Sequence, residues 1–262
     1  MPEGHVSHRN ALRLTAALAG RDLVRIEAPE PRLAPQRIPE RLAGDRVRVV
    51  EAVGKHHLLR FESGRILHSH LMMRGAWRLR RASEGSRLPG LWLALCTADH
   101  VAALVRGPVV RLLEPGEPLP ALAALGPDIL DEGLDPGATT AARLARLEPS
   151  RTVGEALVDQ RVIAGVGNVY KSETCFLAGV DPWRAVGSLE PEEAARLGAT
   201  AASLLAEGVR RAGRIGTGPS RRDRTWVYGR AGRPCRRCGA PIRSRGQGDA
   251  NRTTYWCAVC QG

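Results

Sequence analysis

The sequence predicts an α+β fold, in which a strand-rich first half precedes a helical second half that ends in a cysteine-bearing hairpin. Short segments with β-branched or aromatic residues, separated by turns, fill residues 23–113, whereas helical periodicity dominates after residue 120. Four of the six cysteines lie near the C-terminal end. At 262 residues with 43% hydrophobic residues, the chain is long enough for one large domain or two ordinary ones.

The first predicted element is an amphipathic helix over residues 4–19. Its apolar residues recur at near-helical spacing, and Gly20 follows as a candidate C-cap. The period then changes to that of strands, which predicts a β-sandwich or a flattened barrel. The eight candidate strands are Leu23–Ile26, Arg46–Val50, His57–Phe61, Ile66–Leu71, Ala76–Arg80, Leu91–Cys96, Ala102–Val105 and Val109–Leu113.

Three helices are predicted after a linker at residues 114–120, where glycine and prolines break both periodicities. Thr152 and Glu155 have the spacing of a capping box, which indicates a helix from there to about Gln160. A second helix runs from residue 168 to 178. A third begins at Ser188, with acidic residues in its first turn, and reaches Arg211.

Positive charge is concentrated at the C-terminal end. The chain has a formal net charge of +12, and residues 210–262 contain thirteen Arg, no Lys and two acids. Aromatic residues interleave with these arginines, a pattern typical of a surface that binds nucleic-acid phosphates. A solvated basic tail is the alternative.

The cysteines of this segment form two pairs with metal-ligand spacing. Cys235-x-x-Cys238 and Cys257-x-x-Cys260 are separated by eighteen residues, which predicts a four-thiolate site for one structural Zn²⁺. Two disulfides are the alternative. Cys96 and Cys175 lie among apolar residues, and we expect them to be buried without a chemical role.

The glycine-rich turn at residues 164–168 runs into the second predicted helix. Backbone amides at such a turn can approach a phosphate, although a plain tight turn is the more frequent explanation. The chain uses 37 Arg and only two Lys, Lys55 and Lys171. A lysine retained in such a composition can serve where a compact, tunable charge is needed.

Neither a membrane span nor a secretory signal is predicted. No run of eighteen apolar residues occurs, and the N-terminal residues lack a basic region followed by an apolar stretch. We therefore expect a cytosolic protein, in the bacterial cytosol or nucleoid, with no membrane partner.

Four blocks of the sequence resemble the formamidopyrimidine-DNA glycosylase and endonuclease VIII (Fpg/Nei) family of base-excision repair enzymes. The blocks follow the order of the family and extend almost end to end: residues 1–5, 54–77, 159–173 and 229–257. The resemblance implies a catalytic β-sandwich domain (1–118), a helical domain with a helix-two-turn-helix element (119–228) and a four-cysteine zinc finger (229–262). It also implies damaged DNA as the partner, and we expect a monomer.

The resemblance implies catalytic roles for three residues. Once Met1 is removed, Pro2 presents a secondary amine that is partly neutral at pH 7 and can attack the sugar C1′ of a damaged nucleotide. Glu3 would act as the acid/base that opens the sugar ring. Lys55 matches the catalytic lysine of the β-domain, suited to steady charge near the sugar.

The resemblance also implies the residues that bind DNA. Met72, Met73 and Arg74 align with the stretch that fills the gap left by a flipped nucleotide, although strand alternation suggests that one methionine faces the core. The remaining candidates for DNA contact are Asn168, Lys171 and Arg252.

One segment of the sequence departs from the formamidopyrimidine branch and so indicates which branch of the family the chain resembles. The formamidopyrimidine branch carries an Asp-Pro-Arg-Arg-Phe segment near residues 105–116, where this chain has Val105-Arg106-Gly107-Pro108-Val109. This favours the endonuclease VIII branch and a bifunctional glycosylase and abasic-site (AP) lyase that excises oxidised pyrimidines. Two alternatives are a noncatalytic protein that binds damaged or single-stranded DNA, and an AP lyase with little base excision.

Overall fold

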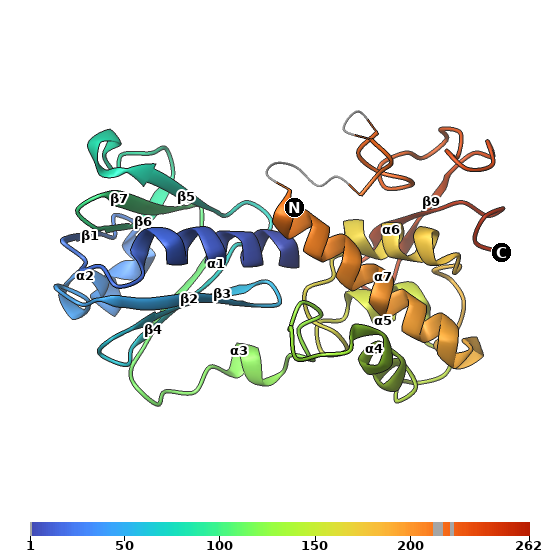
Figure 1. The fold of residues 1–262 in the computed structure, drawn as a ribbon, viewed down its shortest axis with the longest axis horizontal. Helices are drawn as coiled ribbons and strands as arrows, with labels where there is room; N and C mark the ends of the chain where they lie inside the picture. The colour runs from blue at the N-terminus through green and yellow to red at the C-terminus, as the bar shows by residue number, and fades with distance from the viewer. Residues whose placement is uncertain (1, 212–216, 221–222) are drawn as a thin grey trace. The chain divides into compact units, whose positions relative to one another are not determined.

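The computed structural model describes residues 2–211, 217–220 and 223–262 and forms two compact units, residues 1–123 and 124–262 (Figure 1). The first unit is a β-sandwich with one long helix, and the second is mainly helical and ends in a two-stranded hairpin. The predicted α+β fold class is therefore confirmed.

The first unit contains two four-stranded antiparallel sheets. Helix α1 (Gly4–Leu18) packs on strands of both sheets (Figure 1). All eight predicted strands are confirmed, with ends that differ by a few residues. One sheet has the order β1 (Arg25–Glu27), β6 (Leu91–Cys96), β7 (His100–Val105), β5 (Ala76–Arg81); the other has β2 (Val47–Val53), β3 (His56–Phe61), β4 (Ile66–His70), β8 (Val109–Leu113).

The main hydrophobic core of this unit lies between α1 and the sheets. Leu14 and Leu18, one helical turn apart, are 1% and 0% exposed and pack in one cluster with strand residues such as Leu59, Leu67 and Leu104. Short elements that the periodicity does not reveal complete the unit: η1 (Pro31–Gln36), α2 (Ile38–Arg41), η2 (Ala82–Glu84) and α3 (Pro120–Ala123).

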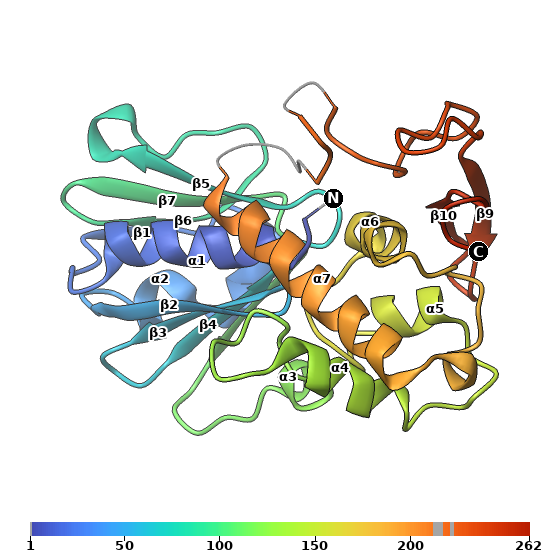
Figure 2. The same cartoon turned by 45° about the vertical axis from the view of Figure 1, so that its right-hand side comes forward.

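The second unit has its own core, which is built around helix α7 (Pro191–Arg210) and the helices that pack on it. Helix α7 packs against α4 (Pro136–Leu144) and α6 (Asn168–Ala178), and α6 also packs against the C-terminal hairpin (Figure 2). The other elements are α5 (Val153–Val158), η3 (Val186–Ser188), β9 (Arg243–Gln247) and β10 (Arg252–Trp256). Helix α6 has the predicted bounds.

Two predicted helix starts differ in detail. The Thr152 side chain does not cap α5; its hydroxyl instead bonds directly to the Glu155 carboxylate. Helix α7 begins at Pro191 with Glu190 as N-cap, so the prediction that Ser188 opens it is wrong. The reason is that Glu190 and Glu193 form the reciprocal capping box and proline suits the first helical position, whereas Ser188 ends η3.

Across residues 2–211, 217–220 and 223–262, no helix combines the length and the apolarity needed to cross a membrane.

Candidate active site and nucleic-acid interface

The N-terminal pair of candidate catalytic residues lies at the start of α1. Pro2 is half-buried, and Glu3 is fully buried as the N-cap residue of the helix. The Glu3 carbonyl accepts the Val6 N–H at 2.8 Å, which closes the first turn. The partial positive charge of a helix N-terminus favours a carboxylate at this position. Glu3 is therefore buried at the start of the helix and directly follows Pro2 in the sequence.

Lys55 occupies the tip of the β2–β3 hairpin. Val53 pairs with His56, so Gly54 and Lys55 form a two-residue loop. Gly54 has φ = 59°, a left-handed conformation that glycine adopts without steric cost. The hairpin thereby presents a half-buried lysine at a defined place.

Three histidines gather beside this hairpin. His56 lies opposite His70 in the β3–β4 register, and His68 lies two residues before His70, so all three share one face of the sheet. His56 Nδ1 and His68 Nε2 are 2.8 Å apart in a hydrogen bond, and the His56 and His70 ring centroids are 4.7 Å apart. Burial lowers the pKa of His56 to about 3 and that of His68 to about 4. Both rings are therefore neutral at neutral pH.

The candidate gap-filling residues lie in the turn that follows β4. Met72 and Met73 are 50% and 62% exposed, so the expectation that one of them faces the core is wrong. Strand alternation stops at His70, and Leu71, only 2% exposed, takes the core position instead. Arg74 is exposed as well. These three residues project from the surface of the first unit.

The turn has a strained conformation. Met72 has φ = 49°, and its N–H donates to His70 Nδ1 at 3.0 Å. A Cβ on Gly75 would lie 2.7 Å from the Leu71 carbonyl oxygen, so only glycine fits the close of the turn. The histidine group and the methionine turn are thus directly connected.

In the second unit, Gln160 builds the glycine-rich turn before α6. Its side-chain amide donates to the carbonyls of Val158 and Val166 at 2.9 and 2.8 Å, and its Oε1 accepts the Gly165 N–H at 3.2 Å. Gly165 has φ = 104°. Gln160 thereby fixes the shape of the turn from which α6 begins.

The three sequence-predicted DNA-binding residues of this unit differ in exposure. Asn168 is 6% exposed, and its Nδ2 donates to the Thr253 carbonyl at 2.8 Å. Lys171 is 1% exposed and lies against the C-terminal hairpin. Arg252 is exposed at the start of β10. Of the three, Arg252 presents the most accessible charge.

Glu173 holds a loop whose position no sequence pattern predicts. Its carboxylate accepts the backbone N–H groups of Trp226, Val227 and Tyr228 at 2.8–2.9 Å and the Thr217 hydroxyl at 2.6 Å. The side chain is fully buried. An acid within the otherwise uncharged stretch 172–178 is the signal that could have pointed to such a role.

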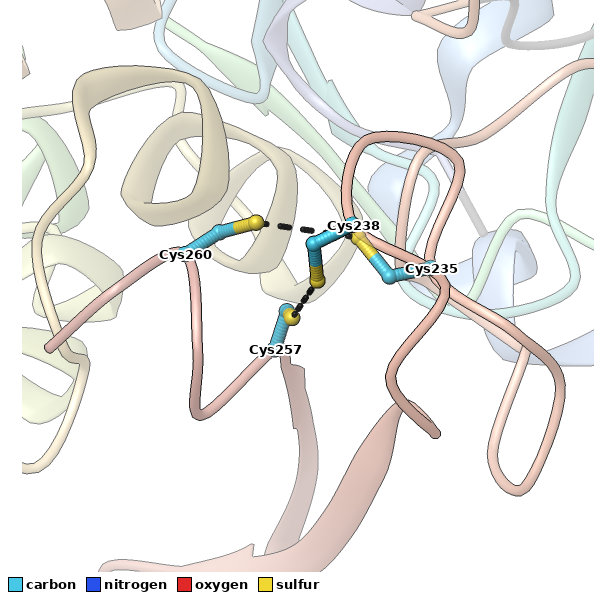
Figure 3. A group of neighbouring side chains, drawn as sticks. All are labelled: Cys235, Cys238, Cys257 and Cys260. Carbon is cyan, nitrogen blue, oxygen red and sulfur yellow. Dashed lines mark hydrogen bonds between the residues drawn. The ribbon is translucent and has the colours of Figure 1, made fainter.

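The four C-terminal cysteines converge as predicted (Figure 3). Their sulfur atoms all lie within 4.8 Å of one another, with Cys235–Cys260 at 3.8 Å and Cys238–Cys257 at 3.5 Å. These separations are too long for disulfides, in which sulfurs lie about 2.05 Å apart. They match the edge of a tetrahedron of thiolates about 2.3 Å from a Zn²⁺ ion. The donor set therefore fits a zinc ion.

The remaining two cysteines are buried, as expected. Cys96 is 3% exposed and Cys175 is 0% exposed, and burial raises the pKa of the Cys175 thiol to about 12. A thiol with so high a pKa is a poor nucleophile.

Comparison with known proteins assigns both units. Residues 1–105 match the model of the formamidopyrimidine-DNA glycosylase N-terminal domain, and residues 125–218 match that of the formamidopyrimidine-DNA glycosylase H2TH (helix-two-turn-helix) domain. A Streptomyces coelicolor protein named probable endonuclease 8 2 is 45% identical, in an alignment that covers all of this chain and 94% of the relative. The chain belongs to the Fpg/Nei family.

Other relatives place this Fpg/Nei protein in the endonuclease VIII branch, as predicted. A Mycolicibacterium smegmatis protein named DNA-(apurinic or apyrimidinic site) lyase Nei2 is 40% identical over the whole chain and 99% of its own length. The fold matches Lactococcus lactis formamidopyrimidine-DNA glycosylase bound non-covalently to DNA containing an AP site. That match has a TM-score of 0.84 and 25% identity and covers 99% of each chain.

Proposed function

We propose that this Fpg/Nei protein is a bifunctional DNA glycosylase and AP lyase that excises oxidised bases, with pyrimidines favoured. The observation that carries the proposal is the placement of Pro2 directly before a buried Glu3 at the N-terminus of α1, in a chain of this family. Removal of Met1 is required, and a small second residue such as proline permits it.

The proposed chemistry begins with attack of the Pro2 nitrogen on C1′ of the damaged nucleotide. The base leaves, and an iminium ion joins C1′ to the protein. The cation acidifies the C2′ proton, so β-elimination breaks the 3′ C–O bond and δ-elimination then breaks the 5′ one. Glu3 would protonate O4′ to open the sugar ring and shuttle protons, and Lys55 would stabilise charge near the sugar.

Separate surfaces of the two units would bind the DNA. Met72, Met73 and Arg74, which project from the first unit, would fill the gap left by the flipped nucleotide. Asn168 and Arg252 would contact backbone phosphates. Cys235, Cys238, Cys257 and Cys260 would hold one structural Zn²⁺, which fixes the ends of the hairpin that carries Arg252.

A second candidate is an AP lyase with little base excision. The M. smegmatis relative, 40% identical, is named an AP lyase, which favours this narrower activity as the alternative. Duplexes that contain an abasic site would then be cleaved, whereas duplexes that contain an oxidised pyrimidine would remain intact.

Borohydride trapping tests both candidates. The protein is incubated with a duplex carrying one 5-hydroxyuracil or one abasic site, reduced, and the linked peptide is mapped by mass. An adduct on Pro2 with both duplexes supports the bifunctional enzyme, and an adduct with the abasic duplex alone supports the lyase. No adduct from protein shown to begin at Pro2 would overturn the proposal.

A further inference from the structure

One face of α6 joins the helix to strand β10 through polar contacts. Asn168, Lys171 and Ser172 have i, i+3, i+4 spacing and therefore share a helix face. They contact three successive residues of β10. Asn168 Nδ2 donates to the Thr253 carbonyl at 2.8 Å, and Lys171 Nζ donates to Thr254 Oγ1 at 2.5 Å. Ser172 Oγ accepts the Tyr255 N–H at 3.3 Å.

Lys171 is the charged member of this face and is only 1% exposed. A buried ammonium is costly unless hydrogen bonds replace its water. Beyond Thr254, it lies 3.4 Å from Gln247 Oε1 on strand β9. Lys171 therefore contacts both strands of the hairpin from its position on α6.

These contacts belong to a chain of hydrogen bonds in which each intermediate side chain accepts a bond from the previous one and donates a bond to the next. The Thr254 hydroxyl donates to Gln247 Oε1 at 2.7 Å, and Gln247 Nε2 donates to Thr152 Oγ1 at 2.9 Å. The Thr152 hydroxyl in turn bonds to the Glu155 carboxylate. The chain has a cation at its first end and an anion at its last, so the charges assist the bonds at both ends. It connects α6, both strands of the hairpin and the start of α5.

Arg252 lies beside this chain of hydrogen bonds. It lies opposite Gln247 in the β9–β10 register, and Thr254 follows it by two residues on the same strand. Lys171, Gln247 and Arg252 also line one pocket of about 230 Å³ within the second unit. The two residues that accept hydrogen bonds from Lys171 therefore flank Arg252: Gln247 lies opposite it, and Thr254 lies two residues along its strand.

The residue types support a specific need for lysine here. The chain uses arginine at 37 of its 39 Lys and Arg positions, yet this buried position keeps a lysine. An ammonium is compact and can direct its protons to closely spaced acceptors, whereas a guanidinium is planar and holds its donors in a fixed fork. Gln247, one of these acceptors, packs closely against α5, because a Cβ on Gly154 would overlap its side-chain amide.

We propose that Lys171 is a positioning residue: it fixes the β9–β10 hairpin on α6 so that Arg252 is held ready for a DNA phosphate. This inference rests on the proposed function. It gives Lys171 a role through Arg252, in place of the direct DNA contact that the sequence suggested.

The test is a double-mutant cycle with Lys171→Met and Arg252→Ala, in which the Kd for an abasic duplex is measured over a range of salt concentrations. We expect each single variant to raise Kd about tenfold and to lower the salt slope by about one. The double variant should bind no more weakly than Arg252→Ala alone. Arg32→Ala, an exposed arginine in η1, is the control for loss of one charge at a remote position.

Additive losses, with the salt slope reduced by about two in the double variant, would mean that Lys171 contacts phosphate directly and would overturn the inference. An unchanged Kd in Lys171→Met would overturn it as well. Should Lys171→Met fail to fold, Thr254→Val, which removes the same link with a side chain of similar shape, replaces it in the cycle.

Hydrogen exchange without DNA separates this inference from the proposed function. In Lys171→Met, the amides of residues 252–256 should exchange at least about tenfold faster, while those of α7 stay unchanged. Unchanged exchange in 252–256 would refute the anchoring. A wild-type protein that binds no abasic duplex would instead refute the proposed function, and the exchange result would still decide whether Lys171 anchors β10.

Discussion

At the scale of single residues, the clearest example of a buried charge that organises backbone is Glu173. Its carboxylate replaces the water that three successive amides, those of residues 226–228, would otherwise bind. Since a carboxylate only accepts hydrogen bonds, it matches a set of donors that no neutral side chain matches equally well. Glu173 thereby connects α6 to the segment that leads into the four-cysteine segment, residues 229–262.

We therefore predict that Glu173→Gln lowers the free energy of unfolding of the second unit by about 2–4 kcal/mol. The amide NH₂ would face N–H donors and leave at least one of them without a partner. Denaturant unfolding measures the loss, and Glu192→Gln, an exposed acid in the first turn of α7, is the matched control. Equal stability of the two variants would contradict this account.

The types of the important residues were more predictable from the sequence than their environments. Pro2 and Glu3 form an unremarkable dipeptide without the family resemblance, since their placement depends on α1 and on burial that no local pattern reports. Lys171 was singled out as one of two lysines, but its partner Gln247 lies 76 residues away in the sequence. A long-range hydrogen bond of this kind leaves no periodic signal.

At the scale of elements, the strands were predictable because each is a short run with β-branched or aromatic residues between turn residues. The order of the strands in the two sheets was not predictable, because strand pairing is long-range: β1 pairs with β6, and β4 pairs with β8. The histidine group depends on the β3–β4 register, which places His56 opposite His70. A slip of one residue would send one set of rings to the other face of the sheet.

The turn at residues 71–75 gives a prediction in which stability and activity change in opposite directions. Met72→Gly removes a left-handed non-glycine residue, so we expect the free energy of unfolding to rise by up to about 1 kcal/mol. The same change removes an apolar wedge, so single-turnover excision of 5-hydroxyuracil should slow by at least about tenfold.

Met73→Gly is the matched variant for this turn, since Met73 is exposed as well but lacks the left-handed conformation. It should slow excision and also lower stability. Faster or unchanged excision in both variants would remove the two methionines from the proposed DNA interface.

The four-cysteine segment has the most local sequence signal, because two short Cys-x-x-Cys turns specify all four donors. We predict that Cys238→Ser loses the metal and DNA binding, while the first unit keeps its fold. Metal content by atomic emission and hydrogen exchange of residues 25–113 measure the two effects. A variant that retains one zinc ion per chain would refute the four-thiolate site.

At the scale of the whole molecule, the two units have separate hydrophobic cores and carry different groups that respond to acid and to chelators. The largest core cluster of each unit draws only on residues of that unit. All seven histidines lie in residues 1–123, whereas the four-cysteine site lies in residues 124–262. Acid and chelators should therefore act on different units.

His57 shows in which direction acid changes the stability of the first unit. Burial lowers its pKa from 6.5 to about 3, so between these values the unfolded chain binds a proton that the folded unit excludes. The stability that neutral His57 provides is complete above pH 6.5 and is lost progressively as the pH falls toward 3. At pH 5 the loss from this one residue is about 2 kcal/mol. His5 and His56 have pKa values lowered to about 3 in the same way and add to it.

We predict two separable unfolding events. Lowering the pH from 7 to 5 should destabilise the first unit, whereas a zinc chelator at pH 7 should destabilise the second, as resolved by hydrogen exchange of each unit. His57→Leu should reduce the loss of stability of the first unit at pH 5 by about 2 kcal/mol, with pH 8 as the internal reference because His57 is neutral there in both states. If acid and chelator unfold both units together, the units share one cooperative transition and their separate cores do not act independently.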